Sequence, residues 1–153
     1  MSGPPRILVV SHPRSAATRA VTEHLVAGIA EGGGIADVRE PPAADLDAVT
    51  AAGAVVLVGP EYFGYMSGLV KDFLERVYDP ARERGVVRPC AVVVTAGNDG
   101  EGALRSVEPI LTGLRWRNPL APLLVRSPAT DADLERTFEL GATLAAGLDA
   151  GVF

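Results

Sequence analysis

Continuous apolar runs alternate with amphipathic stretches along the whole chain. The runs are rich in β-branched residues and predict buried strands at Ile7–Val10, Ala54–Val58, Ala91–Thr95 and Leu120–Val125, with a weaker candidate at Ala36–Arg39. The runs are apolar at successive positions rather than at every second one. We therefore expect a parallel sheet whose two faces are both covered by helices.

Apolar residues at helical spacing lie between these runs and predict five helices. In chain order these are a helix with its stripe over Val21–Ile29 that ends at Gly32–Gly34, a short helix over Ala44–Ala51, a helix with Ser67 as N-cap that closes before Pro80, a helix over Leu104–Leu114, and a helix over Leu134–Leu148 opened at Thr130 or Asp131.

Strand and helix thus alternate five times, with no linker or internal repeat between them. This order predicts a three-layer α/β sandwich with right-handed crossovers, formed by a single domain over residues 1–153. Five strands in a chain of this length fit the flavodoxin-like order 2-1-3-4-5, in which ligands bind at the carboxyl ends of strands 1 and 3.

Composition narrows the range of partners. The chain of 153 residues has a net charge of −5, which argues against nucleic acid or an anionic membrane as the main partner. Cys90 is its single cysteine, so an internal disulfide and a cysteine-based zinc site are both excluded. We find neither a signal-peptide pattern nor an apolar run long enough to span a bilayer, and we expect a cytoplasmic protein.

Three loops are expected at one edge of this sheet because each follows a strand that ends there. They are SHPRSAAT (11–18), GPEYFGYMSG (59–68) and TAGNDGEG (95–102). All three are rich in glycine, hydroxyl or aromatic residues. The loops predicted at the opposite edge are instead rich in proline and charged residues.

The first loop has the chemistry of an anion site. It offers three hydroxyls, one guanidinium and the free N–H groups of a helix N-terminus, on Ser11, Ser15, Thr18, Arg14, Ala16 and Ala17. Simple helix capping by Ser15 or Thr18 is the alternative. Because capping needs one hydroxyl and no arginine, we favour phosphate binding.

Several other site classes lack their motifs. The chain contains no G-x-G-x-x-G dinucleotide fingerprint, no G-x-x-x-x-G-K phosphate loop and no G-x-S-x-G nucleophile elbow. Cys90 begins a strand rather than a loop, which argues against a cysteine phosphatase. His12 and His24 are too few and badly placed for a metal site or a triad. His12 has the chemistry to hydrogen-bond a ligand, but we favour a local structural role for it.

The second and third loops suit a flat heterocycle. Tyr62, Phe63, Tyr65 and Met66 surround Gly64, and aromatic side chains on such a loop can cover a ring. For Phe63 or Met66 taken singly, we favour a side chain that folds back onto the core. The third loop offers backbone N–H groups and Asn98 to the edge of a ring.

At this point the chain resembles the flavodoxin-like superfamily, in particular its small NAD(P)H-dependent FMN reductases and quinone reductases. The stretch PEYFGYMSGLVKDFLERV (60–77) is similar to the family pattern P-x-Y-x-G-x-x-P-G-x-L-K, with Ser67 where the family commonly has proline. Residues 15–18 are similar to the flavodoxin phosphate motif of a hydroxyl, glycine, asparagine and threonine, with alanine at both central positions.

This resemblance implies FMN as cofactor and NAD(P)H as electron donor. The implied cofactor-binding residues are Ser11, Arg14, Ser15, Ala16, Ala17 and Thr18 for the phosphate, Pro60, Glu61, Tyr62, Phe63 and Gly64 along the ring, and Thr95, Ala96, Gly97, Asn98 and Gly100 at the ring edge. In the family the helix after the second loop often contributes to a dimer interface, so a homodimer is expected.

The resemblance implies hydride transfer from NAD(P)H through FMN to a small-molecule acceptor such as a quinone or another flavin. FMN supplies the chemistry in such a scheme, so we name no catalytic side chain and no metal ligand. Two alternatives stay open. One is an electron carrier of the flavodoxin type, and the other is a flavin-free regulatory or assembly domain, which the Ala16–Ala17 pair keeps in play.

Overall fold

Five parallel strands form the central sheet of the computed structural model, which describes residues 3–153. The sheet has the order β2-β1-β3-β5-β6 and is built from β1 (Arg6–Ser11), β2 (Ile35–Arg39), β3 (Ala54–Tyr62), β5 (Cys90–Ala96) and β6 (Leu123–Arg126). This order confirms the predicted flavodoxin-like topology. A short strand that the sequence did not predict, β4 (Tyr65–Met66), pairs antiparallel with the end of β3.

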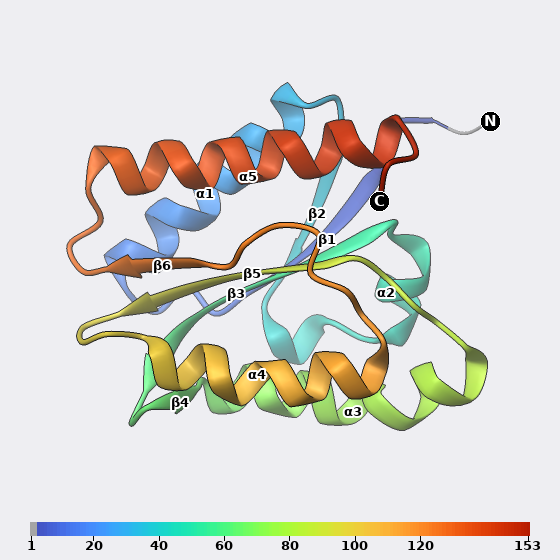
Figure 1. The fold of residues 1–153 in the computed structure, drawn as a ribbon, viewed down its shortest axis with the longest axis horizontal. Helices are drawn as coiled ribbons and strands as arrows, with labels where there is room; N and C mark the ends of the chain where they lie inside the picture. The colour runs from blue at the N-terminus through green and yellow to red at the C-terminus, as the bar shows by residue number, and fades with distance from the viewer. Residues whose placement is uncertain (1–2) are drawn as a thin grey trace.

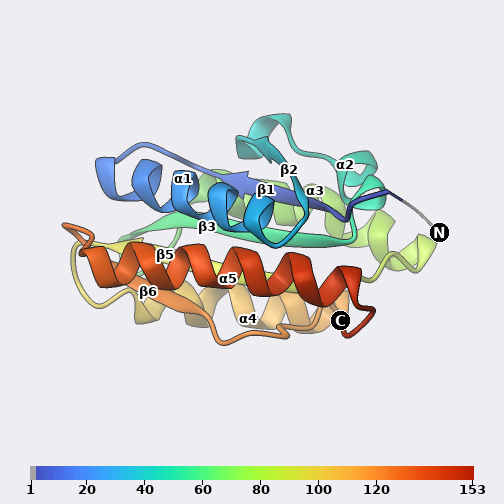
Figure 2. The same ribbon diagram turned by 90° about the horizontal axis from the view of Figure 1, so that it is seen from above.

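Helices cover both faces of the sheet (Figure 1). One face carries α1 (Ala16–Glu31) and α5 (Asp131–Asp149), which lie side by side, and the other carries α2 (Leu46–Ala51), α3 (Gly68–Arg84) and α4 (Glu101–Leu114). Figure 2 shows the three layers from above. A short 3-10 helix, η1 (Pro41–Ala43), precedes α2.

Successive residues of a strand point to opposite faces of the sheet, and both faces are buried because helices cover each of them. Leu8 and Leu57 pack under α2, α3 and α4, whereas Val9 and Val56 pack under α1 and α5. The two layers form separate apolar clusters on the two sides of the sheet. The continuous apolar runs in the sequence are explained by this double covering.

Glycines allow α1 and α5 to approach closely. A Cβ atom at Gly28 would lie 1.9 Å from the backbone oxygen of Phe138, and one at Gly32 would lie 2.4 Å from that of Ala142. On the facing helix, a Cβ atom at Gly141 would lie 2.5 Å from the backbone oxygen of Leu25. Backbone therefore packs directly against backbone where these helices cross.

Two element boundaries near prolines differ from the prediction. The last strand begins at Leu123 rather than Leu120, because Pro122 has no N–H group to donate to a sheet ladder. The third helix was predicted to stop before Pro80, but α3 continues to Arg84. Ala81 is buried in the core beyond the proline, and Gly85 ends the helix in a left-handed conformation with φ of 65°.

The loops that follow β1, β3 and β5 share the carboxyl edge of the sheet, as the sequence predicted. Cys90 and Trp116 belong to the core at a distance from that edge. Cys90 begins β5, and burial raises the pKa of its thiol well above the usual range. Trp116 is buried and donates its indole N–H to the Val86 carbonyl at 3.0 Å, which is a packing role.

Candidate functional site

The N-terminus of α1 forms the first part of the candidate site. Ser15 is the N-cap, with an extended backbone (φ −111°, ψ 161°), and its Oγ accepts a hydrogen bond from the Thr18 N–H at 3.1 Å. Helix geometry leaves the N–H groups of Ala16 and Ala17 without an intrahelical acceptor. Ser15 and Ala16 are exposed, so this helix end is open to a ligand.

The three hydroxyls predicted for the first loop do not converge on one point. Ser11 Oγ is buried and lies 2.7 Å from Thr22 Oγ1. Thr18 Oγ1 is also buried and lies 2.7 Å from Thr95 Oγ1 on β5. Of the three, the Ser15 hydroxyl is the exposed one.

These contacts form a chain of hydroxyls from the first loop to the third. Ser15 Oγ lies 3.0 Å from Thr18 Oγ1, which in turn contacts Thr95 Oγ1. Thr95 is 2% exposed, so this chain of hydroxyls is buried at its β5 end and reaches solvent at Ser15. The end of β5 and the N-terminus of α1 are thereby held in a fixed relation.

Two arginines lie at this positive helix end. Arg14 and Arg19 are both exposed, and the first turn of α1 contains no acidic residue. The Arg19 guanidinium is held beside the loop by long contacts of 3.5 Å to the carbonyls of Pro13 and Arg14. Positive side chains at a helix N-terminus repel the dipole, so this arrangement is stabilised by an anion. Arg19 is an addition to the residues expected at this site, although two arginines around a helix start without an acidic residue are a signal that the sequence contains.

The second loop is a tight hairpin between β3 and β4. Phe63 and Gly64 occupy its two turn positions with φ of 54° and 72°, which defines a type I′ turn. The hairpin is fixed against α4, because Glu61 Oε2 accepts from the Ala103 N–H at 3.3 Å and the Gly64 carbonyl packs against the backbone of Gly102.

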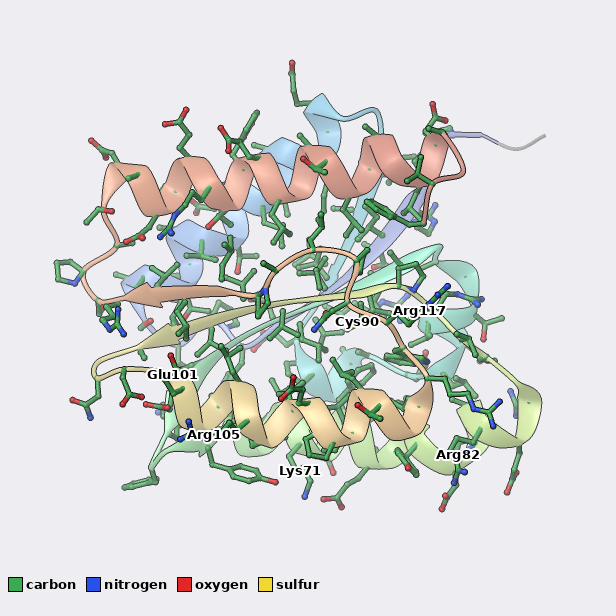
Figure 3. The ribbon with its side chains drawn as sticks, in the orientation of Figure 1. Lys71, Arg82, Cys90, Glu101, Arg105 and Arg117 are labelled. Carbon is green, nitrogen blue, oxygen red and sulfur yellow. The ribbon has the colours of Figure 1, made fainter. Side chains whose placement is uncertain are left out.

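Glu61 therefore has a definite partner that the sequence did not identify. The N-cap position of α4 is Gly100, which has no side chain to cap the helix. The Glu61 carboxylate reaches this helix end from the neighbouring hairpin and also complements its dipole. Figure 3 shows Glu101 at the start of α4 and Arg105 one turn further along the same helix.

The four residues that surround Gly64 point in different directions. Tyr62 packs edge to face on His12, with ring centroids 6.1 Å apart and planes at 86°. The Tyr65 ring lies 5.9 Å from Lys71 Nζ, and Met66 is 5% exposed, so Met66 does fold onto the core. The same expectation for Phe63 is wrong, because the turn directs its side chain into solvent and leaves it 108% exposed.

His12 joins the first loop to the second. Its Nδ1 lies 2.9 Å from the Oγ of Ser67, the N-cap of α3. Burial lowers the pKa of His12, and the charge of Arg14 lowers it further against a smaller opposing effect of Glu40. Ser67 is confirmed as an N-cap. His12 makes a structural contact, but its partner is 55 residues away and not local as predicted.

The third loop is exposed at the carboxyl edge of the sheet. Thr95 and Ala96 are buried at the end of β5, whereas Gly97 and Asn98 are exposed. The loop is held by Ser127, whose N–H donates to the Ala96 carbonyl at 2.8 Å. Gly100 turns the chain into α4 with φ of 77°, where a Cβ atom would lie 2.5 Å from the Leu124 side chain.

The predicted residues of all three loops therefore lie at one edge of the sheet, which is the arrangement of a cofactor site. The part of the chain that the structure describes contains no group of three or more metal-ligating side chains. None of its helices, over residues 3–153, is both long and apolar enough to cross a membrane.

Comparison with known proteins identifies the family. The family model of the NADPH-dependent FMN reductases matches residues 13–130, and the chain belongs to this family. It is therefore a flavodoxin-like flavoprotein of the FMN-binding oxidoreductases. No curated protein matches the chain.

Solved structures support the fold. The chain is similar to a flavodoxin from the domain Archaea, with 20% identity, a TM-score of 0.81, and coverage of 94% of this chain and 99% of that one. It is also similar to a flavodoxin, WrbA-like protein from Agrobacterium tumefaciens (18% identity, TM-score 0.77, 97% and 99% covered). A third similar structure is the NAD(P)H:quinone oxidoreductase from Methanothermobacter marburgensis (16% identity, TM-score 0.68, 96% and 100% covered).

Proposed function

We propose that this protein binds FMN at the carboxyl edge of its sheet. We further propose that it uses FMN to oxidise NAD(P)H and to reduce a quinone, another flavin or a similar electrophilic acceptor. Membership of the NADPH-dependent FMN reductase family supports both the cofactor and the donor. When bound, FMN supplies the redox chemistry, because it can accept a hydride from the nicotinamide and pass two electrons on to the acceptor.

The N-terminus of α1 is the observation that carries this proposal. The N–H groups of Ala16 and Ala17 have no intrahelical acceptor and can donate to a phosphate. Alanine in place of the asparagine of the flavodoxin motif removes one side-chain contact but keeps these backbone donors. Arg14 and Arg19 add positive charge on the same side. The residues present therefore fit the phosphate of FMN.

The chain of hydroxyls leaves the Ser15 hydroxyl as one more hydrogen-bond donor to that phosphate. Ser15, Thr18 and Thr95 carry three hydroxyl protons, and the two contacts between them use two. With an anion at the open end, Thr95 donates to Thr18, Thr18 donates to Ser15, and Ser15 donates outward. Thr18 and Thr95 thus support the site from behind, without contacting the ligand.

The ring of FMN would lie between the hairpin and the third loop. The backbone from Pro60 to Gly64 offers a rigid wall, because contacts with α4 fix it. The exposed backbone of Gly97 and Asn98 offers N–H donors to the ring edge. Glu61 is occupied at the N-terminus of α4, so we assign it no role as a general acid.

Two matched ligands and one variant test this proposal. We expect the purified protein to retain FMN after desalting, seen as visible absorption, and to bind riboflavin, which lacks the phosphate, much more weakly. Ser15→Asp keeps a good N-cap but places a negative charge at the phosphate position. Because a carboxylate there also complements the helix dipole and the two arginines, it should leave the melting temperature of the apo protein unchanged or raise it, and it should weaken FMN binding by at least about tenfold.

Activity separates the enzyme from an electron carrier. We expect the FMN-loaded protein to oxidise NADPH or NADH in the presence of a quinone, followed as loss of nicotinamide absorption. Retained FMN without NAD(P)H oxidation would indicate a carrier. Failure to bind FMN at all would indicate a flavin-free domain and overturn the proposal.

We also propose a cytoplasmic homodimer. The family resemblance supports it, together with the partly exposed apolar side chains of Tyr65 and Leu69 near the start of α3. Sedimentation of the purified protein tests the oligomeric state.

A further inference from the structure

The two edges of the sheet, β2 and β6, differ in their protection against pairing with another chain (Figure 2). An edge strand carries unpaired backbone N–H and C=O groups, and natural proteins block such an edge with proline, lysine, a bulge or a covering segment. β6 has four residues and lies between Pro122 and Pro128. β2 has five residues, contains neither proline nor lysine, and packs mainly against β1 and α1. The outer edge of β2 is therefore open to pairing.

The outward backbone groups of β2 belong to Ala36 and Val38, and those of Glu40 continue the row. The Ile35 N–H donates to the carbonyl of Pro5, just before β1, at 2.8 Å, so the odd-numbered residues of β2 bond the neighbouring strand. Backbone groups alternate in direction along a strand, so those of the even-numbered residues point away from the sheet. Glu40 keeps an extended backbone with φ of −70° and ψ of 151°. Three outward positions are thus available to a partner strand.

β2 also exposes apolar side chains on both of its faces. Val38 is 47% exposed and lies on the α1 face, where it lines an open groove together with Val26. The groove has a volume of about 420 Å³, which leaves room for a second valine side chain beside the first. Ile35 is 44% exposed on the opposite face of the strand. Exposed apolar side chains on an open edge strand favour its pairing with another strand.

The sequence of β2 is complementary to itself when two copies pair antiparallel about Val38. In this register, Val38 lies opposite Val38 of the second copy, and Asp37 lies opposite Arg39 of the second copy. By symmetry the pairing contains two such opposite-charge pairs on one face and an apolar pair on the other, and both kinds of pair stabilise a sheet. Within one chain, Arg39 Nε already lies 3.1 Å from Asp37 Oδ1, so the four charged groups can join in one network.

The neighbouring registers are less favourable. Outward residues must oppose outward residues, so the symmetry axis of the pair passes through a residue and not between two. An axis at Asp37 places this carboxylate opposite itself, and an axis at Arg39 does the same with the guanidinium; like charges directly opposite each other destabilise a sheet. An axis at Ala36 places Ile35 opposite Asp37. The register about Val38 is the one in which both the apolar and the charged positions match.

We propose that β2 is an interaction surface for a second copy of this chain, which adds its own β2 antiparallel in the Val38 register and joins the two sheets into one. The outward N–H and C=O groups of Val38 bond their symmetry mates, and those of Ala36 bond Glu40 of the second copy. Because the strands are antiparallel, the carboxyl edges of the two sheets point in opposite directions, and each copy keeps its own candidate site. This contact is separate from the start of α3, where Tyr65 and Leu69 lie, and it does not depend on the proposed function.

Cysteine cross-linking tests the register. Val38→Cys places two thiols at the symmetry axis on Cα atoms about 5.5 Å apart, within the range of a disulfide. Ile35→Cys is the matched control, because Ile35 is similarly exposed on the same strand, whereas its two copies would lie about 20 Å apart. Cys90 is buried and does not compete. Under mild oxidation in air, we expect Val38→Cys to form a covalent dimer at least about tenfold faster than Ile35→Cys.

A charge substitution tests the surface independently. Val38→Lys places two ammonium groups opposite each other, so it should halve the sedimenting mass of the parent assembly. Its melting temperature should stay within about 2 °C of the parent value, because the side chain is half exposed. Leu69→Lys, at a position that is 39% exposed in α3, is the control. Combined with Val38→Cys, it should leave the rate of cross-linking unchanged.

Every other outcome overturns the inference. Equal cross-linking of Val38→Cys and Ile35→Cys would indicate random collision or a different register. A parent protein that sediments as a monomer, or a Val38→Lys variant that keeps the parent mass, would show that β2 does not pair. Loss of association in Leu69→Lys alone would place the subunit contact on α3. None of these readouts involves FMN or NAD(P)H, so failure of the proposed function would be recognised separately.

Discussion

His12 is a titratable side chain enclosed between two loops of the site. It contacts Ser67 through Nδ1 and Tyr62 through its ring, and it is 5% exposed. Protonation would place a charge in this enclosed position beside Arg14, and Glu40 offsets that charge only in part. The folded protein therefore favours the neutral imidazole, with a pKa below the ordinary value of 6.5.

This preference predicts a loss of stability in mild acid. Because the unfolded chain binds the proton more readily, the stabilisation is complete above pH 6.5 and is lost as the pH falls from there through the lower pKa of the folded state. His12→Asn keeps a polar atom near the Nδ1 position and does not titrate. We expect its free energy of unfolding, measured in urea, to change less between pH 7 and pH 5.5 than that of the parent protein. An identical pH dependence in the two proteins would contradict this account.

The roles of single residues were the least predictable part of the site. The sequence places Ser11, Ser15 and Thr18 within eight residues, but which hydroxyl faces solvent depends on partners far along the chain. Thr18 meets Thr95, which is 77 residues away, and so points inward. Phe63 and Met66 looked equivalent in the sequence, yet the turn geometry buries one and exposes the other.

The crossing of α1 and α5 shows how one atom can decide the packing of two helices. A Cβ atom at Gly28 would overlap the backbone oxygen of Phe138, which cannot move as the end of a flexible side chain can. We expect Gly28→Ala to lower the free energy of unfolding by roughly 1–3 kcal/mol or more, although alanine favours helix formation. Chemical denaturation measures this change.

Gly68 provides the matched control for that substitution. It lies at the start of α3, and a Cβ atom there would have nothing within 4 Å. Gly68→Ala should therefore leave stability unchanged or raise it by up to about 1 kcal/mol. Equal effects of the two substitutions on the free energy of unfolding would show that the close helix crossing is not the reason why position 28 requires glycine.

Element types were predictable from the sequence, and element ends were less so. Apolar runs and helical stripes identified every parallel strand and long helix, because burial on known faces leaves a periodic signal. Boundaries depended on tertiary contacts that no local pattern contains. Pro80 did not end α3, since Ala81 packs into the core beyond it, and β4 forms only because a two-residue turn returns the chain onto β3.

At the scale of the whole molecule, the order of the sheet was predictable because few topologies are compatible with five alternating strands and helices. The same reasoning placed the loops after β1, β3 and β5 at one edge, and the structure confirms that placement. The connections between the loops were not predictable. The Thr18–Thr95 and His12–Ser67 contacts join three segments into one site, and both arise only after the sheet has formed.

Because these segments form one site only in the folded protein, binding of FMN must stabilise the whole fold. A ligand that binds only the folded state at 100 times its Kd adds about 2.7 kcal/mol to the free energy of unfolding. For a domain of this size, that corresponds to a rise in melting temperature of roughly 5–10 °C. Thermal unfolding monitored by circular dichroism, with FMN and with riboflavin, measures the effect.

The rise should be much smaller with riboflavin, because the N–H groups of Ala16 and Ala17 and the charges of Arg14 and Arg19 act on the phosphate. Equal shifts from the two ligands would show that the N-terminus of α1 does not hold the phosphate. No shift from either would place this chain among flavodoxin-like domains that work without a flavin.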